Sequence, residues 1–416
     1  MKNGGNAPSP RSPSSLYIHI PFCAGACDYC DFYSVPITAT EPYSADSPPA
    51  RFVETLLSEA GRLFERCKPA CVPTLYIGGG TPSVLGAAGI SRLLRELSRI
   101  IGISSPPPME ITIEANPESA DEAFLAAARE GGATRLSLGV QSFYGPSRRA
   151  VRRVGSQAPD ETLLHSRIAL AAAYFPGAFS GDLMSGLPFQ DEKVLLDDIS
   201  ALLAYKPAHV SFYALTVEAE TPLSNARPSF LPAPDEADRL WLCGRDTLEK
   251  SGYSQYEVSN FCKAGSESRH NIRYWLMQNW LALGPAASGT IIDDETGTGF
   301  RYTNPQDVDL WLSGKVNLFS ASSRKGGESC EKLDSLTLIK ETFLMGFRYI
   351  EGPDEELFQR RFRRGIDDFI PETLAAWRKR GLLQNGKIAL TKEGFLFLDP
   401  FLACAFKELE LSFSAC

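Results

Sequence analysis

The 416-residue sequence lacks long apolar runs and any excess of positive charge. No apolar run reaches the roughly 18 residues that a membrane-spanning helix needs, so we expect no such helix. Residues 1–14 are polar and rich in Ser and Pro, which predicts a disordered tail without the apolar centre of a secretory signal. The formal net charge of -8 argues against bulk binding to nucleic acid, because a phosphate backbone attracts cationic surfaces. These absences together favour a cytoplasmic protein.

Side chains that bind metals are scarce outside one short stretch. The chain has only four histidines, and most of its ten cysteines are scattered without a ligand-like repeat. The scattered cysteines, which we expect to be plain thiols, are Cys67, Cys71, Cys243, Cys262, Cys330, Cys404 and Cys416. Thiols stay reduced in the cytosol, so a cluster of cysteines there indicates metal or redox chemistry rather than disulfides.

The remaining three cysteines form a C-x3-C-x2-C array at Cys23, Cys27 and Cys30, directly after an apolar strand. A structural zinc site usually takes four ligands from two separated pairs, and this sequence has no second pair at such a spacing. Three thiolates on one loop suit a cubane 4Fe-4S cluster whose fourth iron stays open to a small molecule. Zinc and bystander thiols are the weaker alternatives.

Strand and helix patterns alternate six times between residues 15 and 220, which predicts an α/β fold with a parallel sheet. The alternation fades before eight units are complete, so we expect a partial (β/α) barrel of six units. We expect an irregular barrel extension over 221–319, with one clear helix at 235–250. Residues 320–416 are predicted to form a small helical, winged-helix-like domain, in which the basic run 360–364 is a solvated helix face.

Polar or glycine-rich residues follow several of the predicted strands. A triple glycine at 78–80 is followed by Thr81, and Glu114, Gln141 and Asp182 each lie at the end of a strand. The carboxyl ends of parallel strands meet at one mouth, where such folds place their active sites. Glycines let a ligand approach the backbone closely, and we expect the exposed N–H groups there to meet a carboxylate. A lone acid at a strand end is more often a cap or an ion-pair partner, but several together indicate a ligand site.

The cysteine array with its lead-in "YIHIPFC" resembles the radical S-adenosylmethionine (SAM) superfamily. Within it, residues 15–400 resemble the oxygen-independent coproporphyrinogen III oxidase family, which includes heme chaperones of the HemW type. The resemblance implies that SAM chelates the open iron, and that the reduced cluster can pass an electron to its sulfonium. The positions that match SAM contacts in this family are Tyr17, Tyr29, Gly79, Gly80, Thr81, Glu114, Gln141, Arg153, Asp182 and Ala214.

The resemblance leaves two functional classes, a heme carrier and an enzyme that decarboxylates coproporphyrinogen III. The oxidases usually have a further cysteine two residues after the third, whereas this chain has Phe32, as in the HemW type. The segment "HNIRYW", beginning at His270, matches a motif associated with heme handling in that type. A neutral imidazole is a good iron ligand, and Tyr274 and Trp275 would offer an aromatic wall. A lone histidine beside aromatics is more often a packed residue.

If the protein is a heme carrier, heme is its cargo and His270 is the candidate ligand. This function implies a heme-acceptor protein, which can be membrane-associated. Two histidines usual in the family are absent, because the chain has Gly155 and Ser288 at those positions. These departures leave a third reading, a diverged radical SAM enzyme that acts on another substrate.

Overall fold

Six parallel strand–helix units form the first half of the chain in the computed structural model. It describes residues 12–37, 47–102, 109–153, 161–219, 221–226, 230–314 and 329–414. The predicted tail lies almost wholly outside these ranges, as do Gly155 and residues 326–328. The strands are β1 (Ser15–Ile20), β4 (Thr74–Gly79), β5 (Glu110–Ala115), β6 (Arg135–Gln141), β7 (Phe179–Ser185) and β8 (His209–Ala214). They pair in chain order, all parallel, which confirms the predicted six-unit α/β sheet.

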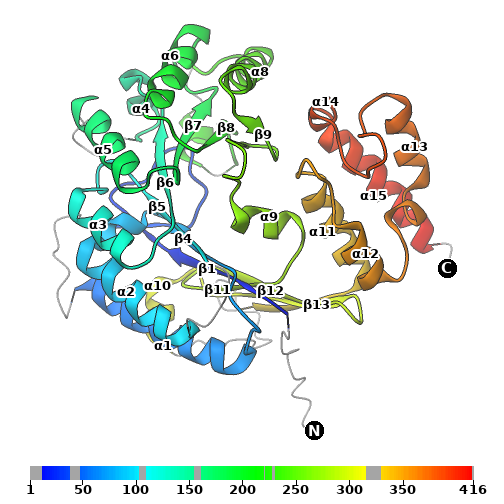
Figure 1. The fold of residues 1–416 in the computed structure, drawn as a ribbon, viewed down its shortest axis with the longest axis horizontal. Helices are drawn as coiled ribbons and strands as arrows, with labels where there is room; N and C mark the ends of the chain where they lie inside the picture. The colour runs from blue at the N-terminus through cyan, green and yellow to red at the C-terminus, as the bar shows by residue number, and fades with distance from the viewer. Residues whose placement is uncertain are drawn as a thin grey trace.

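Helices between these strands cover the outer face of the sheet (Figure 1). They are α1 (Pro48–Cys67), α2 (Gly86–Ile101), α3 (Glu122–Glu130), α4 (Gly145–Ala150), α5 (Glu161–Tyr174) and α6 (Glu192–Leu203). In α1 the buried residues Phe52, Leu56, Ala60 and Leu63 recur every three or four positions, so one face packs on the sheet. The Ser47 side chain caps the start of α1 by accepting from the Ala50 N–H.

The sheet continues beyond the six units on both sides, to twelve strands in all among the described residues. On one side, β11 (Trp280–Leu283) runs parallel to β1 and is followed by β12 (Ser288–Asp293), β13 (Thr298–Thr303) and β14 (Ser329–Leu333). On the other side, β10 (Asn260–Cys262) and β9 (Ser254–Gln255) pair antiparallel after β8. The expectation of an irregular segment after residue 220 was therefore wrong.

Short helices accompany these added strands. They are α7 (Pro222–Ala226), α8 (Pro234–Lys250), α9 (Arg269–Trp275) and α10 (Val308–Leu312). Of these, α9 contacts both β4 and α11 (Ser335–Gly346), so it links the sheet to the C-terminal helices (Figure 1).

The C-terminal helices enclose a second apolar core. Besides α11 they are α12 (Glu355–Phe362), the 3-10 turn η2 (Ile366–Asp368), α13 (Pro371–Lys379), α14 (Lys392–Phe395) and α15 (Leu398–Ser414). Phe343, Phe358, Trp377 and Phe401 belong to this core. The predicted wing is a turn closed by a single bridge between Leu383 and Leu390. Because β14 still belongs to the main sheet, we propose that the C-terminal domain begins after Leu333 rather than at residue 320.

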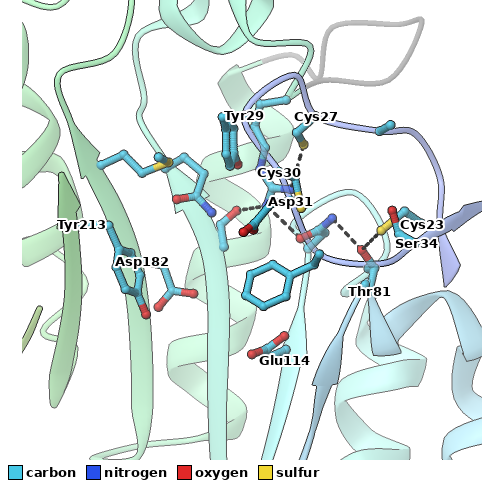
Figure 2. A pocket seen from close by; sticks show the side chains of 18 of the residues that line it. Cys23, Cys27, Tyr29, Cys30, Asp31, Ser34, Thr81, Glu114, Asp182 and Tyr213 are labelled. Carbon is cyan, nitrogen blue, oxygen red and sulfur yellow. Dashed lines mark hydrogen bonds between the residues drawn. The ribbon is translucent and has the colours of Figure 1, made fainter. Parts of the chain in front are cut away.

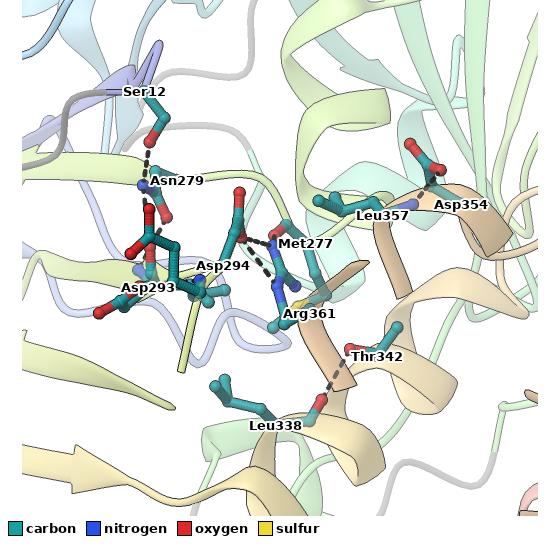
Figure 3. A network of polar contacts seen from close by, with 12 residues as sticks. Ser12, Met277, Asn279, Asp293, Asp294, Leu338, Thr342, Asp354, Leu357 and Arg361 are labelled. Atoms are coloured by element: carbon teal, nitrogen blue, oxygen red, sulfur yellow. Dashed lines mark hydrogen bonds and ion pairs between the residues drawn. The ribbon is translucent and has the colours of Figure 1, made fainter. Parts of the chain in front are cut away.

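The expectation that residues 360–364 form a solvated helix face was wrong for Arg361. Its side chain is buried, forms an ion pair with Asp294 at 2.8 Å and donates to the Met277 carbonyl at 3.2 Å (Figure 3). Arg361 lies on α12, whereas its partners lie beside β12 and β11, so the pair joins the two cores.

Candidate functional site

The carboxyl ends of the parallel strands open onto a cavity of about 420 Å³. The cysteine loop lies over it: Cys23 ends β2 (Phe22–Cys23), and Cys27 and Cys30 follow before β3 (Val35–Pro36), which pairs with β2 in parallel. Figure 2 shows Glu114 and Asp182 below this loop, on β5 and β7, which flank β6 in the sheet. Nine of the ten predicted SAM-contacting residues line the cavity together with the three cysteines. Those nine are Tyr29, Gly79, Gly80, Thr81, Glu114, Gln141, Arg153, Asp182 and Ala214.

The three cysteines are half-buried thiols with hydrogen-bonding groups beside them. Burial raises the pKa of Cys30 to about 11 and raises the pKa of Cys23. Both thiols therefore stay protonated at neutral pH until a metal displaces their protons. In the described part of the chain, no three His, Cys, Asp or Glu side chains gather around one point as a single metal ion requires. A cubane cluster needs no such gathering, because each thiolate binds its own iron.

Glycines in the "GGGT" segment allow close packing beneath the cysteine loop. A side chain at Gly80 would lie 2.6 Å from the Phe22 carbonyl oxygen and 3.1 Å from Cys23 Sγ. A side chain at Gly79, whose φ is +105°, would overlap the His19 ring at 2.5 Å. Both glycines are therefore explained by contacts within the protein.

In the structure, the backbone N–H groups that are expected to meet a ligand carboxylate have partners within the protein. Gly79 N–H donates to Glu114 at 3.2 Å, Gly80 N–H to the Ile20 carbonyl at 2.7 Å, and Thr81 N–H to the Phe22 carbonyl at 2.7 Å. All three of these donors are therefore engaged within the protein.

Two carboxyl groups that line the larger cavity have raised pKa values. Burial raises the pKa of Glu114 to about 7 and that of Asp182 to about 6. Glu114 accepts from the Tyr76 hydroxyl at 2.6 Å, and Asp182 accepts from the Ser137 hydroxyl at 3.0 Å. A bound ammonium or ribose hydroxyl would favour the charged carboxylates here.

Gln141 has two unusual features for a residue at the end of a strand. Its φ is +67°, in the left-handed region, and the register with β7 shifts beside it. Its Oε1 is buried and has no hydrogen-bond partner among the described residues. A strained backbone and an unsatisfied acceptor at a cavity are typical of a ligand-binding position.

Asn116 joins residues that approach two of the cysteines, and sequence reasoning missed it. Its Nδ2 donates to Thr81 Oγ1 at 3.0 Å, and Thr81 Oγ1 lies 3.5 Å from Cys23 Sγ. Its Oδ1 accepts from Arg153, whose other Nη atom lies 3.8 Å from Cys27 Sγ. Figure 2 shows the contact between Thr81 and Cys23 as a dashed line. The sequence signal was an amide two residues after Glu114, just past the strand end.

Tyr17, the tenth predicted SAM contact, lies instead on a neighbouring cavity of about 250 Å³. This smaller cavity is also lined by His270 and Tyr274, and Phe32 lines both cavities. The Tyr17 hydroxyl is 3.0 Å from His19 Nδ1. The ring nitrogen Nε2 of His19 lies 2.9 Å from the Tyr33 carbonyl, so this nitrogen carries the proton and Nδ1 accepts from Tyr17.

His270 is buried between two tyrosine rings. The ring centroids of Tyr76 and Tyr274 lie 5.0 Å and 4.9 Å from the imidazole centroid.

Ser288 stands at the position where the resemblance leads us to expect a histidine. Its hydroxyl forms hydrogen bonds with the Tyr302 carbonyl and the Thr303 hydroxyl. None of the helices that the structure describes is both long and apolar enough to cross a membrane.

Comparison with known proteins agrees with the fold and the cysteine loop. Residues 17–201 match the family model described as "Radical SAM superfamily". The structure of Escherichia coli coproporphyrinogen III oxidase, HemN, has the same fold, with a TM-score of 0.76 and 22% identity over 95% of this chain and 90% of that chain. The sheet, the loop and the match together define a radical SAM protein.

Relatives that align with nearly the whole chain identify the family within this superfamily. The heme chaperone HemW of Escherichia coli is 33% identical, over 93% of this chain and 98% of its own length. The mouse protein "Radical S-adenosyl methionine domain-containing protein 1, mitochondrial" is 33% identical, over 97% of this chain and 87% of its own. The chain belongs to the HemW family of radical SAM proteins.

Proposed function

We propose that this protein is a heme chaperone that holds a 4Fe-4S cluster on Cys23, Cys27 and Cys30, binds SAM and passes heme to an acceptor protein. The observation that carries the proposal is the likeness to the heme chaperone HemW of Escherichia coli over 93% of the chain. The acceptor would be a heme protein, free or membrane-associated, and the proposed location is the cytosol.

The residues around the larger cavity fit the proposed cofactors. Three thiols on one loop leave a fourth iron open, and SAM would supply its amino and carboxylate groups there and a sulfonium for one-electron chemistry. Glu114 and Asp182 would accept from its ammonium and ribose groups. Gln141 Oε1 would find the partner it lacks. Arg153 would pair with its carboxylate, since this guanidinium donates to the Asn116 amide, the Gly139 carbonyl and the Cys27 thiol, none of which is a carboxylate.

Phe32 favours the carrier over the oxidase. Where the oxidases usually place a further thiol, this chain has an aromatic ring that is 64% exposed and lines both cavities. A phenyl ring offers no proton, electron or metal ligand, but its face can pack against a flat apolar molecule.

A hydrogen-bond chain sets the tautomer of His270. Arg273 and Thr74 both donate to the Ser15 hydroxyl, at 2.6 Å and 2.9 Å. The Thr74 proton is thereby used, so Thr74 Oγ1 accepts from His270 Nδ1 at 2.9 Å. The lone pair of His270 therefore resides on Nε2, which is the form of imidazole that binds iron. Burial lowers the pKa of His270 to about 3, so the ring stays neutral.

Heme ligation by His270 also requires a movement. Nε2 is buried without a hydrogen-bond partner among the described residues, and the cavity of about 250 Å³ is below the range of about 300–1,000 Å³ for sites that enclose a drug-sized ligand. We therefore propose that Tyr274 swings away when heme binds, with part of the macrocycle resting outside this cavity.

Heme titration of His270→Gln against wild type tests this site. His209→Gln is the matched control, because His209 is equally buried but both its ring nitrogens are bonded, to Ser180 at 2.8 Å and Tyr256 at 2.9 Å. We expect His270→Gln to weaken heme binding at least about tenfold, which corresponds to about 1.4 kcal/mol. Equal affinities of wild type and His270→Gln would remove His270 as the ligand.

The cluster is tested separately by anaerobic reconstitution with iron and sulfide. We expect Cys23→Ala to lose the cubane absorption spectrum, because one of the three thiolate ligands is removed. The exposed Cys404→Ala variant is the control and should retain it. A full cubane spectrum in Cys23→Ala would refute the cluster assignment.

A further inference from the structure

Asn116 is held rigidly just beyond the end of β5. Its backbone N–H donates to Ser83 Oγ at 3.2 Å, and its carbonyl accepts from the N–H groups of Ser119 and Ala120 at 3.1 Å and 2.9 Å. The Ser83 hydroxyl is itself 2.6 Å from Ser119 Oγ. With the backbone fixed on both sides, the side-chain amide has few orientations available.

The chemistry of Arg153 decides which way the amide faces. A guanidinium can only donate, so the atom that meets Arg153 Nη2 at 2.7 Å must be the amide oxygen. The amide nitrogen is then the atom 3.0 Å from Thr81 Oγ1, and it can only donate. Asn116 therefore accepts on one side and donates on the other, and no other orientation satisfies both neighbours.

This polarity fixes the direction of the Thr81 hydroxyl. Because Thr81 Oγ1 accepts from Asn116, its own proton is free to point at Cys23 Sγ, 3.5 Å away. A cysteine sulfur bound to iron is a thiolate and can only accept. The hydrogen bonds thus run from Asn116 to Thr81 to Cys23.

The other arm of the amide holds Arg153 beside a second sulfur. Arg153 Nη2 also donates to the Gly139 carbonyl, while its Nη1 points to Cys27 Sγ at 3.8 Å. A side chain at Gly139 would lie 2.6 Å from Arg153 Nη2, so glycine makes room for this arrangement. One amide therefore orients a hydroxyl donor toward one cluster sulfur and a cation toward another.

We propose that Asn116 is a positioning residue that raises the reduction potential of the cluster, by directing the Thr81 hydroxyl at Cys23 and holding Arg153 at Cys27. The proposal rests on the 4Fe-4S cluster of the proposed function. Hydrogen bonds and positive charge at cluster sulfurs stabilise the reduced cluster, which is the more negative state. Asn116 acts through its two neighbours and touches neither iron nor sulfur.

The substitution Asn116→Asp reverses this chain with a side chain of nearly the same shape. A carboxylate accepts on both sides, so the Thr81 proton turns toward residue 116 and away from Cys23. We expect the midpoint potential of the reconstituted cluster to shift to more negative values, measured by dithionite titration with mediators and electron paramagnetic resonance. Asn116→Ala forces no reversal, so it should shift the potential in the same direction but less.

A double-mutant cycle with Thr81→Val separates the effect of reorienting the Thr81 hydroxyl from the effect of the negative charge that Asn116→Asp adds. Valine has no hydroxyl to reorient, so the shift caused by Asn116→Asp should be smaller in the Thr81→Val background. Equal shifts in both backgrounds would mean that only the added charge acts, and would overturn the proposed role of Thr81. Unchanged potentials in Asn116→Asp and Asn116→Ala would overturn the proposal altogether.

The iron content of wild type distinguishes the two possible failures. A wild-type protein that binds no iron after reconstitution would overturn both the cluster and the role of Asn116. A wild-type protein with a full cluster, whose potential none of the Asn116 variants shifts, would overturn the role of Asn116 and leave the proposed function standing.

Discussion

Replacing Gly80 by alanine should displace the cysteine loop from its position beside β4. An added side chain would lie 2.6 Å from the Phe22 carbonyl oxygen, 2.9 Å from the Ile20 carbonyl oxygen and 3.1 Å from Cys23 Sγ. The loop cannot simply shift, because Gly80 N–H donates to the Ile20 carbonyl and Thr81 N–H to the Phe22 carbonyl, both at 2.7 Å. Overpacking of this kind costs about 1–3 kcal/mol, and each weakened hydrogen bond adds about 1 kcal/mol. We expect a loss of about 3 kcal/mol in the free energy of unfolding.

Urea denaturation and iron content after reconstitution measure the two consequences of Gly80→Ala. The cluster should be lost more readily than the fold, because Cys23 Sγ must move while most of the sheet is untouched. Gly61→Ala is the control, since a side chain at this position of α1 would meet nothing within 4 Å. It should stabilise the protein slightly, by about 0.5–1 kcal/mol. If Gly80→Ala keeps both the wild-type unfolding free energy and the wild-type iron content, the packing explanation of this glycine is refuted.

Three further predictions concern stability. Arg361→Ala leaves Asp294 without its partner and should cost about 2–3 kcal/mol in urea denaturation, whereas the exposed Arg360→Ala should change stability by less than about 0.5 kcal/mol; equal losses would contradict the role of the pair. Burial raises the pKa of Glu257 to about 8, so the native state favours its protonated form and wild-type stability should fall as pH rises from 4.5 to about 8. Glu257→Gln should remove that fall, on the order of 4 kcal/mol, and parallel pH curves for the two proteins would contradict it. The pKa of His270 is lowered to about 3, so the native state favours the neutral ring, and the free energy of unfolding should fall as pH falls from 6.5 toward 3. His270→Gln should make the free energy of unfolding, measured by urea denaturation, less dependent on pH in this range. The same pH dependence in both proteins would contradict the lowered pKa.

The parallel core could be predicted from the sequence because its signals are local. Apolar residues recur along α1 with helical spacing, the strands are short apolar runs, and polar residues follow them. Cysteine spacing likewise lies within eight residues, from Cys23 to Cys30. Such signals need no knowledge of which distant segments meet.

What the sequence could not predict depends on contacts between distant segments. The strands β11 to β13 are only four to six residues long, and they are defined by pairing with β1 and with each other. The direction of the Asn116 amide depends on Arg153, which is 37 residues away in the chain. The engaged N–H groups of the triple glycine follow from strand register, which composition does not reveal.

The most direct test follows heme and coproporphyrinogen III on one preparation of reconstituted protein. We predict saturable binding of one heme per chain in a spectroscopic titration. With SAM, dithionite and coproporphyrinogen III, the same preparation should give no decarboxylated porphyrinogen by mass spectrometry. Saturable heme binding without decarboxylation would support a chaperone of the HemW family. Decarboxylated product, or a titration without saturation, would contradict it.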